Sequence, residues 1–364
     1  MADVLFVTGM HRSGTSAFAG STKLVGARHP SRLFEADESN ARGYFESKRV
    51  VALNDEALRR MGRTWNDCRP MPELDPAARD ALIGEIETTL HGELGESHQI
   101  LVLKDPRISL LSRFWGKALR NMGHRPVFAI MLRNPEASAA SLVKRDGLSD
   151  EASLAIWLRY MLRAELDTRD YPRAIVLVEN FLSDPVETLR HLQDRIPISW
   201  PVDPRDRRAE IQAFVDKDML SAPLDLQADV TGLARRAYAL FRRLSETPYD
   251  RFIQEELDRI REELNRRSDC IHSRMSIDQL MKALDRKQKL DRLARFSHRD
   301  PIDPIKALQK AYRQPLHPII CYAKHLFYLG VSKLVGGFAP RVAARAKQKA
   351  DKYDPDRFSL ISRP

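Results

Sequence analysis

The chain has 364 residues, of which 43% are hydrophobic, so it is long enough to bury one large core or two smaller ones. Its 3 cysteines, Cys68, Cys270 and Cys321, lie far apart without a Cys-x-x-Cys pair, which excludes a disulfide framework or a zinc knuckle and fits a reducing compartment. The net charge is +10, but residues 301–364 hold 12 Lys and Arg against 4 Asp and Glu, so the rest is nearly balanced and does not indicate a nucleic-acid binder.

Residues 4–8, with the sequence VLFVT, form a short apolar run that ends at a glycine. Such a run is typical of a strand that is buried on both faces of a parallel sheet. Residues 16–25 then predict a helix, so the chain begins like a βαβ unit. No basic region followed by a long apolar stretch precedes the strand, and we expect a cytoplasmic protein without a signal peptide.

Three later apolar runs predict further strands, and helical patterns lie between them. The strands are expected at 100–103, 127–132 and 174–178, and the helices at 76–91, 110–122, 136–144 and 152–168. Alternating strands and helices predict an α/β fold with a P-loop-type parallel sheet flanked by helices. We expect this domain to span residues 1–215.

After about residue 200 the sequence predicts only helices. The apolar positions of the first follow a 3–4 spacing: Ile253, Leu257, Ile260, Leu264 and Ile271. Ser276 is a candidate N-cap for a second helix that carries Leu280, Leu284 and Leu293. We therefore expect a C-terminal helical extension over 216–300, a hairpin or short coiled coil. It either packs on the sheet domain or on a second subunit, giving a homo-oligomer, or forms a separate arm that binds a partner.

The basic tail, residues 301–364, contains a strongly apolar stretch at 318–338. Lys324, His325 and Lys333 interrupt this stretch, which makes it a poor transmembrane span. Two interpretations remain: a helix buried against the domain, or a basic amphipathic segment that lies on the inner membrane surface as a peripheral contact.

Residues 6–18, FVTGMHRSGTSAF, lie between the first strand and the first helix. A glycine loop at this place points backbone N–H groups toward a phosphate-like group. In a nucleotide-binding P-loop a lysine precedes the last Ser/Thr, but here Thr15 stands in its place and the cation is Arg12. Asp105 imitates a magnesium-binding Asp at a strand end, yet Pro106 and Arg107 beside it favour a cationic site.

This loop resembles the 5′-phosphosulfate loop of sulfotransferases that use 3′-phosphoadenylyl sulfate (PAPS), especially bacterial members of the carbohydrate or heparan type. The matching residues are Arg12, Ser13, Gly14, Thr15 and Ser16. Arginine replaces the more usual lysine at position 12. A loop that merely makes a tight turn is the alternative interpretation.

Further segments match the same family in the right order, over residues 4–196. Arg133 follows a strand and Ser141 comes eight residues later, as in the family's 3′-phosphate site. Glu179, Asn180 and Asp184 resemble its strand-end acidic segment, which we interpret as structural, although Asn180 replaces the usual Asp. Residues 43–46, Gly-Tyr-Phe-Glu, resemble an element that follows the loop in bacterial members. The family's Arg-Lys-Gly segment is missing, with Arg205, Arg207 or Arg208 as candidate substitutes.

The resemblance implies PAPS as co-substrate, no required metal, and a hydroxyl acceptor on a saccharide or glycolipid. Arg12 would stabilise charge on the leaving phosphate, and Lys104 would bridge the donor sulfate and the acceptor oxygen, unless it only makes a strand-end ion pair. Glu46 is the first candidate for the catalytic base, with Glu35 and Asp37 as alternatives. His11 is a further alternative, but its place inside the loop favours a structural or donor-contacting role. Trp65, exposed by pattern, would either stack on a sugar ring or cap the core.

Two other functions remain open from the sequence. A P-loop kinase that acts on a small molecule would require magnesium and the lysine that this loop lacks. A non-catalytic nucleotide-binding scaffold would use the helical extension to recruit partners.

Overall fold

The computed structural model describes residues 3–36, 43–94, 99–215, 230–247 and 249–297. The chain forms two units, Met1–His272 and Ser273–Pro364. The described residues of the second unit belong to the end of helix α11 (Arg251–Ser297). All other described elements lie in the first unit.

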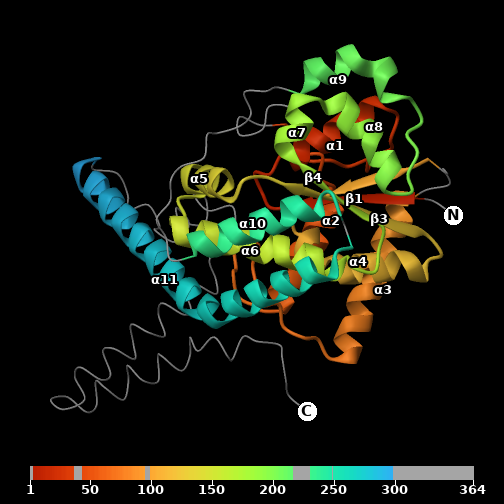
Figure 1. Cartoon of the computed structure of the whole chain (residues 1–364). Coiled ribbons are helices and arrows are strands. Elements are labelled where there is room, and N and C mark those ends of the chain that lie inside the picture. Colours follow the sequence, from red (N-terminus) through yellow and green to blue (C-terminus); the bar gives the residue numbers. More distant parts are fainter. Residues whose placement is uncertain (1–2, 37–42, 95–98, 216–229, 248, 298–364) are drawn as a thin grey trace. The chain divides into compact units, whose positions relative to one another are not determined.

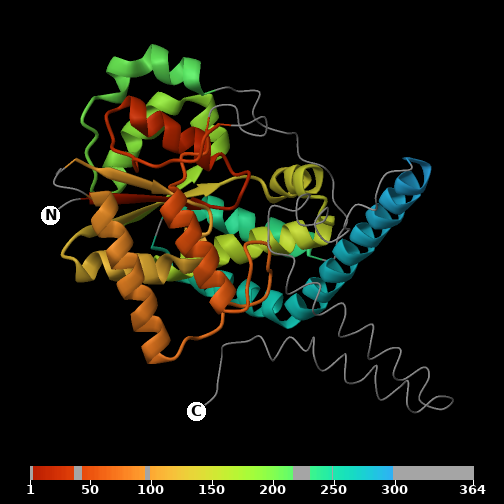
Figure 2. The ribbon, with the colours of Figure 1, turned by 180° about the vertical axis from the view of Figure 1, so that it is seen from behind.

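Four parallel strands form the sheet of the first unit, and helices cover both of its faces (Figures 1 and 2). In chain order they are β1 (Asp3–Gly9), β2 (Leu101–Lys104), β3 (Arg125–Leu132) and β4 (Arg173–Leu177). The spatial order is β2-β1-β3-β4. The α/β fold class and the four strands predicted from the sequence are therefore confirmed.

In the sheet, β1 lies between β2 and β3, the two strands that follow it in the chain. The chain goes to one side of β1 to form β2 and to the other side to form β3, so the order reverses beside β1. In the register, Val7 pairs with Lys104 and Gly9 pairs with Met131, so the carboxyl ends of the three strands lie at one edge. Ligands of open α/β sheets bind at this kind of switch point.

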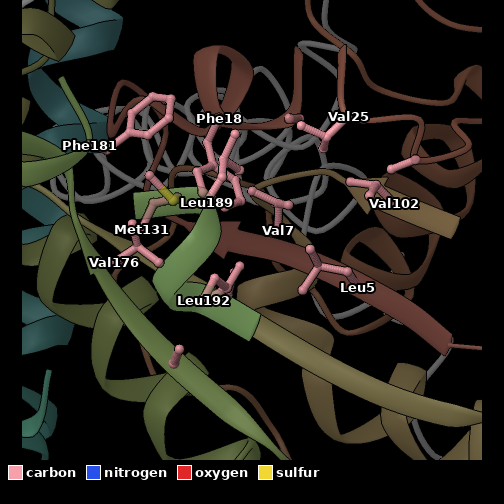
Figure 3. Packing of buried hydrophobic residues seen from close by; sticks show 14 of the residues in the cluster. Leu5, Val7, Phe18, Val25, Val102, Met131, Val176, Phe181, Leu189 and Leu192 are labelled. Carbon is pink, nitrogen blue, oxygen red and sulfur yellow. The ribbon is translucent and has the colours of Figure 1, made fainter. Parts of the chain in front are cut away.

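Side chains alternate between the two faces of β1. Leu5 and Val7 belong to the core cluster with Phe18 of α1 (Thr15–Leu24) and Leu189 of α8 (Pro185–Arg195), as Figure 3 shows. On the opposite face, the ring of Phe6 packs edge-on against Trp115 of α4 (Ile108–Asn121), at 6.0 Å between centroids. The continuous apolar run in the sequence is thus explained by burial on both faces.

Three further helices of the first unit, α2, α5 and α6, begin at side-chain caps. Ser47, Asn134 and Ser149 accept hydrogen bonds from backbone N–H groups in the first turns of α2, α5 and α6. The remaining elements and their bounds are α2 (Lys48–Arg60), α3 (Pro76–Leu94), α5 (Pro135–Asp146), α6 (Asp150–Asp167), α7 (Val178–Ser183), the 3-10 helix η1 (Pro204–Arg207), α9 (Arg208–Phe214) and α10 (Thr231–Leu244).

The predicted helical hairpin is wrong, because α11 continues as one helix of 47 residues through Ser276. The residues around Ser276, SRMSIDQL, include no glycine or proline that would end the helix, so the serine stands in its interior. The apolar positions predicted for the first half of this segment are buried: Ile253, Leu257, Ile260, Leu264 and Ile271. The first unit therefore includes α10 and the beginning of α11.

The basic tail 301–364 lies outside the described residues, so its membrane contact stays a prediction, as does a homo-oligomer through the extension. Within the described ranges, no helix combines the length and the apolar character needed to cross a bilayer.

We expect Gly9→Ala to destabilise the first unit strongly. The φ of Gly9 is 127°, and a Cβ there would lie 2.7 Å from the backbone carbonyl oxygen of Met131 in the adjacent strand. Because the sheet prevents this carbonyl from moving, the free energy of unfolding should fall by about 3 kcal/mol or more, measured by urea denaturation. Gly62→Ala is the control, since Gly62 also has a positive φ (63°) but open space around it, and should cost about 1 kcal/mol. Equal losses would contradict the steric argument.

Candidate functional site

The loop between β1 and α1 has the backbone geometry of an anion-binding turn. Gly14 is the N-cap of α1 with a φ of 72°, and a Cβ on it would come within 3.1 Å of Val178. The backbone N–H of Ser13 donates to the carbonyl of Met10 at 3.2 Å, which closes the turn. The first N–H groups of a helix have no intrahelical acceptor, and the helix dipole places partial positive charge there. The end of the loop is therefore suited to a phosphate or sulfate group.

The ammonium group that the loop lacks at position 15 comes from the neighbouring strand. Thr15 is buried, while Lys104 at the end of β2 donates from Nζ to Ser16 Oγ at 3.1 Å and to Glu46 Oε1 at 2.5 Å. The side chains of Lys104 and Glu46 are 2% and 12% exposed. Lys104 and Glu46, two of the three predicted catalytic residues, are therefore in contact beside the first turn of α1.

The backbone around Glu46 is fixed on both sides. The carbonyl of Glu46 accepts from the N–H of Phe34 at 2.9 Å, and Ser47 caps α2. Phe45 has a φ of 56°, a left-handed conformation that is uncommon for a bulky residue, and its ring packs edge-on against His29. The strained residue turns the chain so that Glu46 points to Lys104.

The predicted 5′ and 3′ halves of the donor site are joined by direct hydrogen bonds. Arg12 donates from Nε to Ser141 Oγ at 2.8 Å, and Arg133 donates from Nη1 to the carbonyl of Arg12 at 2.6 Å. Burial lowers the pKa of Arg133, and the nearby Arg12 lowers it further. Burial also lowers the pKa of Arg12, with Arg145 adding to the effect. Glu179 acts in the opposite direction on the pKa of Arg133, and Asp146 on that of Arg12, so nearby carboxylates offset part of the repulsion between the two cations. A ligand with negative charge would offset more of it.

The acidic segment after β4 makes structural contacts. Glu179 accepts through Oε1 from the backbone N–H of Asn134 at 3.3 Å, and Asn134 is the residue that follows Arg133 in the sequence. Asp184 caps α8 by accepting from the N–H of Glu187 at 3.1 Å. These contacts place the segment behind the site and fit the interpretation of both carboxylates as structural.

The other candidate bases occupy different surroundings. Glu35 is exposed, and Asp37 lies outside the described residues. The imidazole of His11 packs edge-on against Trp65, at 4.9 Å between centroids, and against Tyr160, at 5.7 Å. Among the candidate bases in the described ranges, only Glu46 has a side-chain hydrogen bond to Lys104, which also donates to Ser16 in the first turn of α1.

Trp65 is buried, with 9% of its surface exposed, so its predicted exposure was wrong. Its carbonyl accepts a hydrogen bond from Tyr160 at 2.7 Å, and the guanidinium of Arg145 lies 5.7 Å from its ring centroid. The local sequence could not predict the burial of Trp65, because the side chains that contact it come from distant segments: Arg145 of α5, Tyr160 of α6 and His11 of the loop after β1. Trp65 therefore caps the core and the loop and offers no free face for a sugar ring.

Asp105 is committed to contacts within the protein. It is fully buried, and it accepts from Arg107 Nη1 at 3.0 Å and from Asn54 Nδ2 at 2.8 Å. Arg107 also forms an ion pair with Asp55 at 2.6 Å. In the part of the chain that the structure describes, no group of three or more His, Cys, Asp or Glu side chains is arranged to hold a metal ion.

Arg235 of α10 was not among the residues singled out from the sequence. It forms an ion pair with Glu136 in the first turn of α5, three residues after Arg133. The candidate substitutes proposed for the missing family segment bind carboxylates near themselves: Arg205 binds Asp203, Arg207 binds Glu210 and Arg208 binds Glu187. Arg235 lies in a helix whose position relative to α5 no local pattern reveals.

No protein-family model and no curated protein match this chain. Among solved structures, the chain is similar to the sulfotransferase domain of the Synechococcus PCC 7002 olefin synthase, with 17% identity, a TM-score of 0.38, and coverage of 64% of this chain and 93% of that domain. It is also similar to the sulfotransferase domain of the curacin biosynthetic pathway, with 13% identity, a TM-score of 0.35, and coverage of 69% and 99%. Similarity at this level carries no information on substrate or catalytic residues, so the chemistry has to follow from the side chains described above.

Proposed function

We propose that this chain is a sulfotransferase that transfers the sulfuryl group of PAPS to an acceptor hydroxyl. One observation carries the proposal: Arg12 in the phosphate loop contacts both Ser141 and Arg133, which are 129 and 121 residues away in the chain. A cationic loop joined to a second cationic site at the end of β3 fits a ligand with two separate anionic groups, such as a 5′-phosphosulfate and a 3′-phosphate.

The residues fit this donor in chemistry as well as in position. The loop and the N-terminus of α1 would hold the 5′-phosphosulfate, and Arg133 with Ser141 would hold the 3′-phosphate. Ser13 Oγ is buried in the loop and has no hydrogen-bond partner among the described residues, which is the state expected of a hydroxyl that binds a ligand oxygen. Ser16 lies beside it at the start of α1.

In the proposed reaction the donor supplies the sulfuryl group, and the chain stabilises charge and moves one proton. Arg12 and the loop N–H groups face the phosphate that gains negative charge as its bond to sulfur breaks. Lys104 uses two of its three N–H donors on Ser16 and Glu46, and we assign the third to the transferred group. Glu46 takes the proton of the acceptor hydroxyl as the new oxygen–sulfur bond forms.

We propose a saccharide or glycolipid hydroxyl as the acceptor and the cytoplasm as the location. The resemblance of the loop residues 12–16 to bacterial sulfotransferases of the carbohydrate or heparan type supports the acceptor class. No step of this mechanism is assigned to a metal ion, because Lys104 and Arg12 supply the positive charge that a P-loop kinase takes from lysine and magnesium.

We expect the protein to bind adenosine 3′,5′-bisphosphate in the absence of magnesium and to bind ADP at least about tenfold more weakly, because ADP has no 3′-phosphate for Arg133. Isothermal titration calorimetry checks this. Arg133→Ala should weaken bisphosphate binding by about 10- to 100-fold and leave ADP binding nearly unchanged. Arg60→Ala, which removes a surface ion pair with Glu85, is the control and should change neither affinity. Binding of ADP alone would overturn the proposal in favour of a kinase.

We expect Glu46→Gln to lower kcat by about 10²- to 10⁴-fold with little change in the donor KM, because the amide cannot accept the acceptor's proton. The rate is measured with ³⁵S-labelled donor. Glu35→Gln is the matched control, since Glu35 is an exposed carboxylate from the same segment, and its turnover should be normal. Normal turnover by Glu46→Gln would remove Glu46 as the base and support a non-catalytic role of its contact with Lys104.

A further inference from the structure

Arg12 has an unusual backbone conformation for a side chain of its size. Its φ is 67°, in the left-handed region that disfavours residues with a Cβ, and among the described non-glycine residues only Phe45 shares a positive φ. Two hydrogen bonds depend on this turn: the guanidinium of Arg12 donates to Ser141, and its carbonyl accepts from Arg133. A strained residue persists only where its surroundings hold it.

The residue before Arg12, His11, is itself held by packing against two aromatic rings. The imidazole of His11 meets Trp65 and Tyr160 edge-on, with interplanar angles of 63° and 65°. Tyr160 closes this arrangement by donating from its hydroxyl to the carbonyl of Trp65 at 2.7 Å. We call His11, Trp65 and Tyr160 the aromatic clamp.

The aromatic clamp is anchored outside the strand-loop-helix unit that it holds. Trp65 lies in the segment 62–72, where the carbonyl of Cys68 accepts from Arg159 Nε at 2.9 Å. Cys68 Sγ in turn donates to the carbonyl of Ser268 in α11 at 3.5 Å. Helices α6 and α11 thus fix the two aromatic residues against which His11 packs.

The position of His11 fits packing better than proton transfer. Its Nε2 atom is buried and has no hydrogen-bond partner among the described residues, and its ring packs edge-on against Trp65 and Tyr160. Burial lowers the pKa of His11 well below its ordinary value, and the cations Arg107, Arg145, Lys104 and Arg12 lower it further. The neutral ring therefore adds no charge to the loop near pH 7.

We propose that His11 is a positioning residue: through the aromatic clamp it holds Arg12 in its left-handed conformation, so that Arg12 binds the donor together with Ser141 and Arg133. This role rests on the proposed function, since it concerns the donor site. It assigns His11 to donor binding through Arg12 and leaves the proton of the acceptor to Glu46.

The test compares His11→Phe with His11→Ala in the full chain. Phenylalanine keeps the ring and removes both nitrogens, so bisphosphate affinity and kcat should stay within about threefold of the unaltered protein, whereas alanine should weaken bisphosphate binding by about tenfold. A thermal unfolding scan of each variant shows whether it is folded. Tyr160→Phe, which only removes the hydrogen bond to Trp65, gives a milder variant that should fall between them.

A double-mutant cycle separates positioning from general stability. If His11 acts through Arg12, then His11→Ala should weaken bisphosphate binding by less than about twofold once Arg12→Ala is present, because the positioned group is gone. Additive effects in the cycle, or loss of turnover by His11→Phe with normal bisphosphate binding, would overturn the proposal. A lack of bisphosphate binding by the unaltered protein would instead overturn the proposed function, and the role of His11 with it.

Discussion

The register of the parallel sheet is the constraint on which the site depends. Because Val7 of β1 pairs with Lys104 of β2, an ammonium group from a different strand arrives beside the first turn of α1. Because Gly9 pairs with Met131, the loop after β1 and Arg133 after β3 begin at the same edge. A shift of one residue in either pairing would turn these side chains to the other face of the sheet and separate the charges.

The placement of the cations supports the proposal that a loop without the P-loop lysine binds an anion. A lysine at position 15 would belong to the loop, so the conformation of the loop would set the position of its ammonium group. Here Thr15 is buried and the charge is divided between Arg12 in the loop and Lys104 on the adjacent strand. This division puts a cation on each side of the helix start, and Lys104 is also joined to Glu46, the candidate base.

Much of this could be predicted from the sequence, because it depends on local patterns. Short apolar runs identified all four strands. The shared phosphate site of Arg133 and Ser141 came from the family resemblance and stays a prediction, although both residues form hydrogen bonds with Arg12. What the sequence did not reveal depends on packing between distant segments: Trp65 is buried by α6 and the loop, and Arg235 reaches α5 from α10. The hairpin was mispredicted because Ser276 is a good cap by type but has no breaker beside it, so the helix simply continues.

The aromatic clamp shows why such long-range packing matters for the chemistry. Strain at Arg12 is a cost of folding that local sequence does not offset, so it has to be balanced by contacts from elsewhere. His11, the adjacent residue, receives these contacts from Trp65 and Tyr160, which α6 and α11 hold in turn. The helices beyond the sheet are therefore connected to the loop after β1 through the ring of His11, and we infer that a change in their packing would alter the conformation of Arg12.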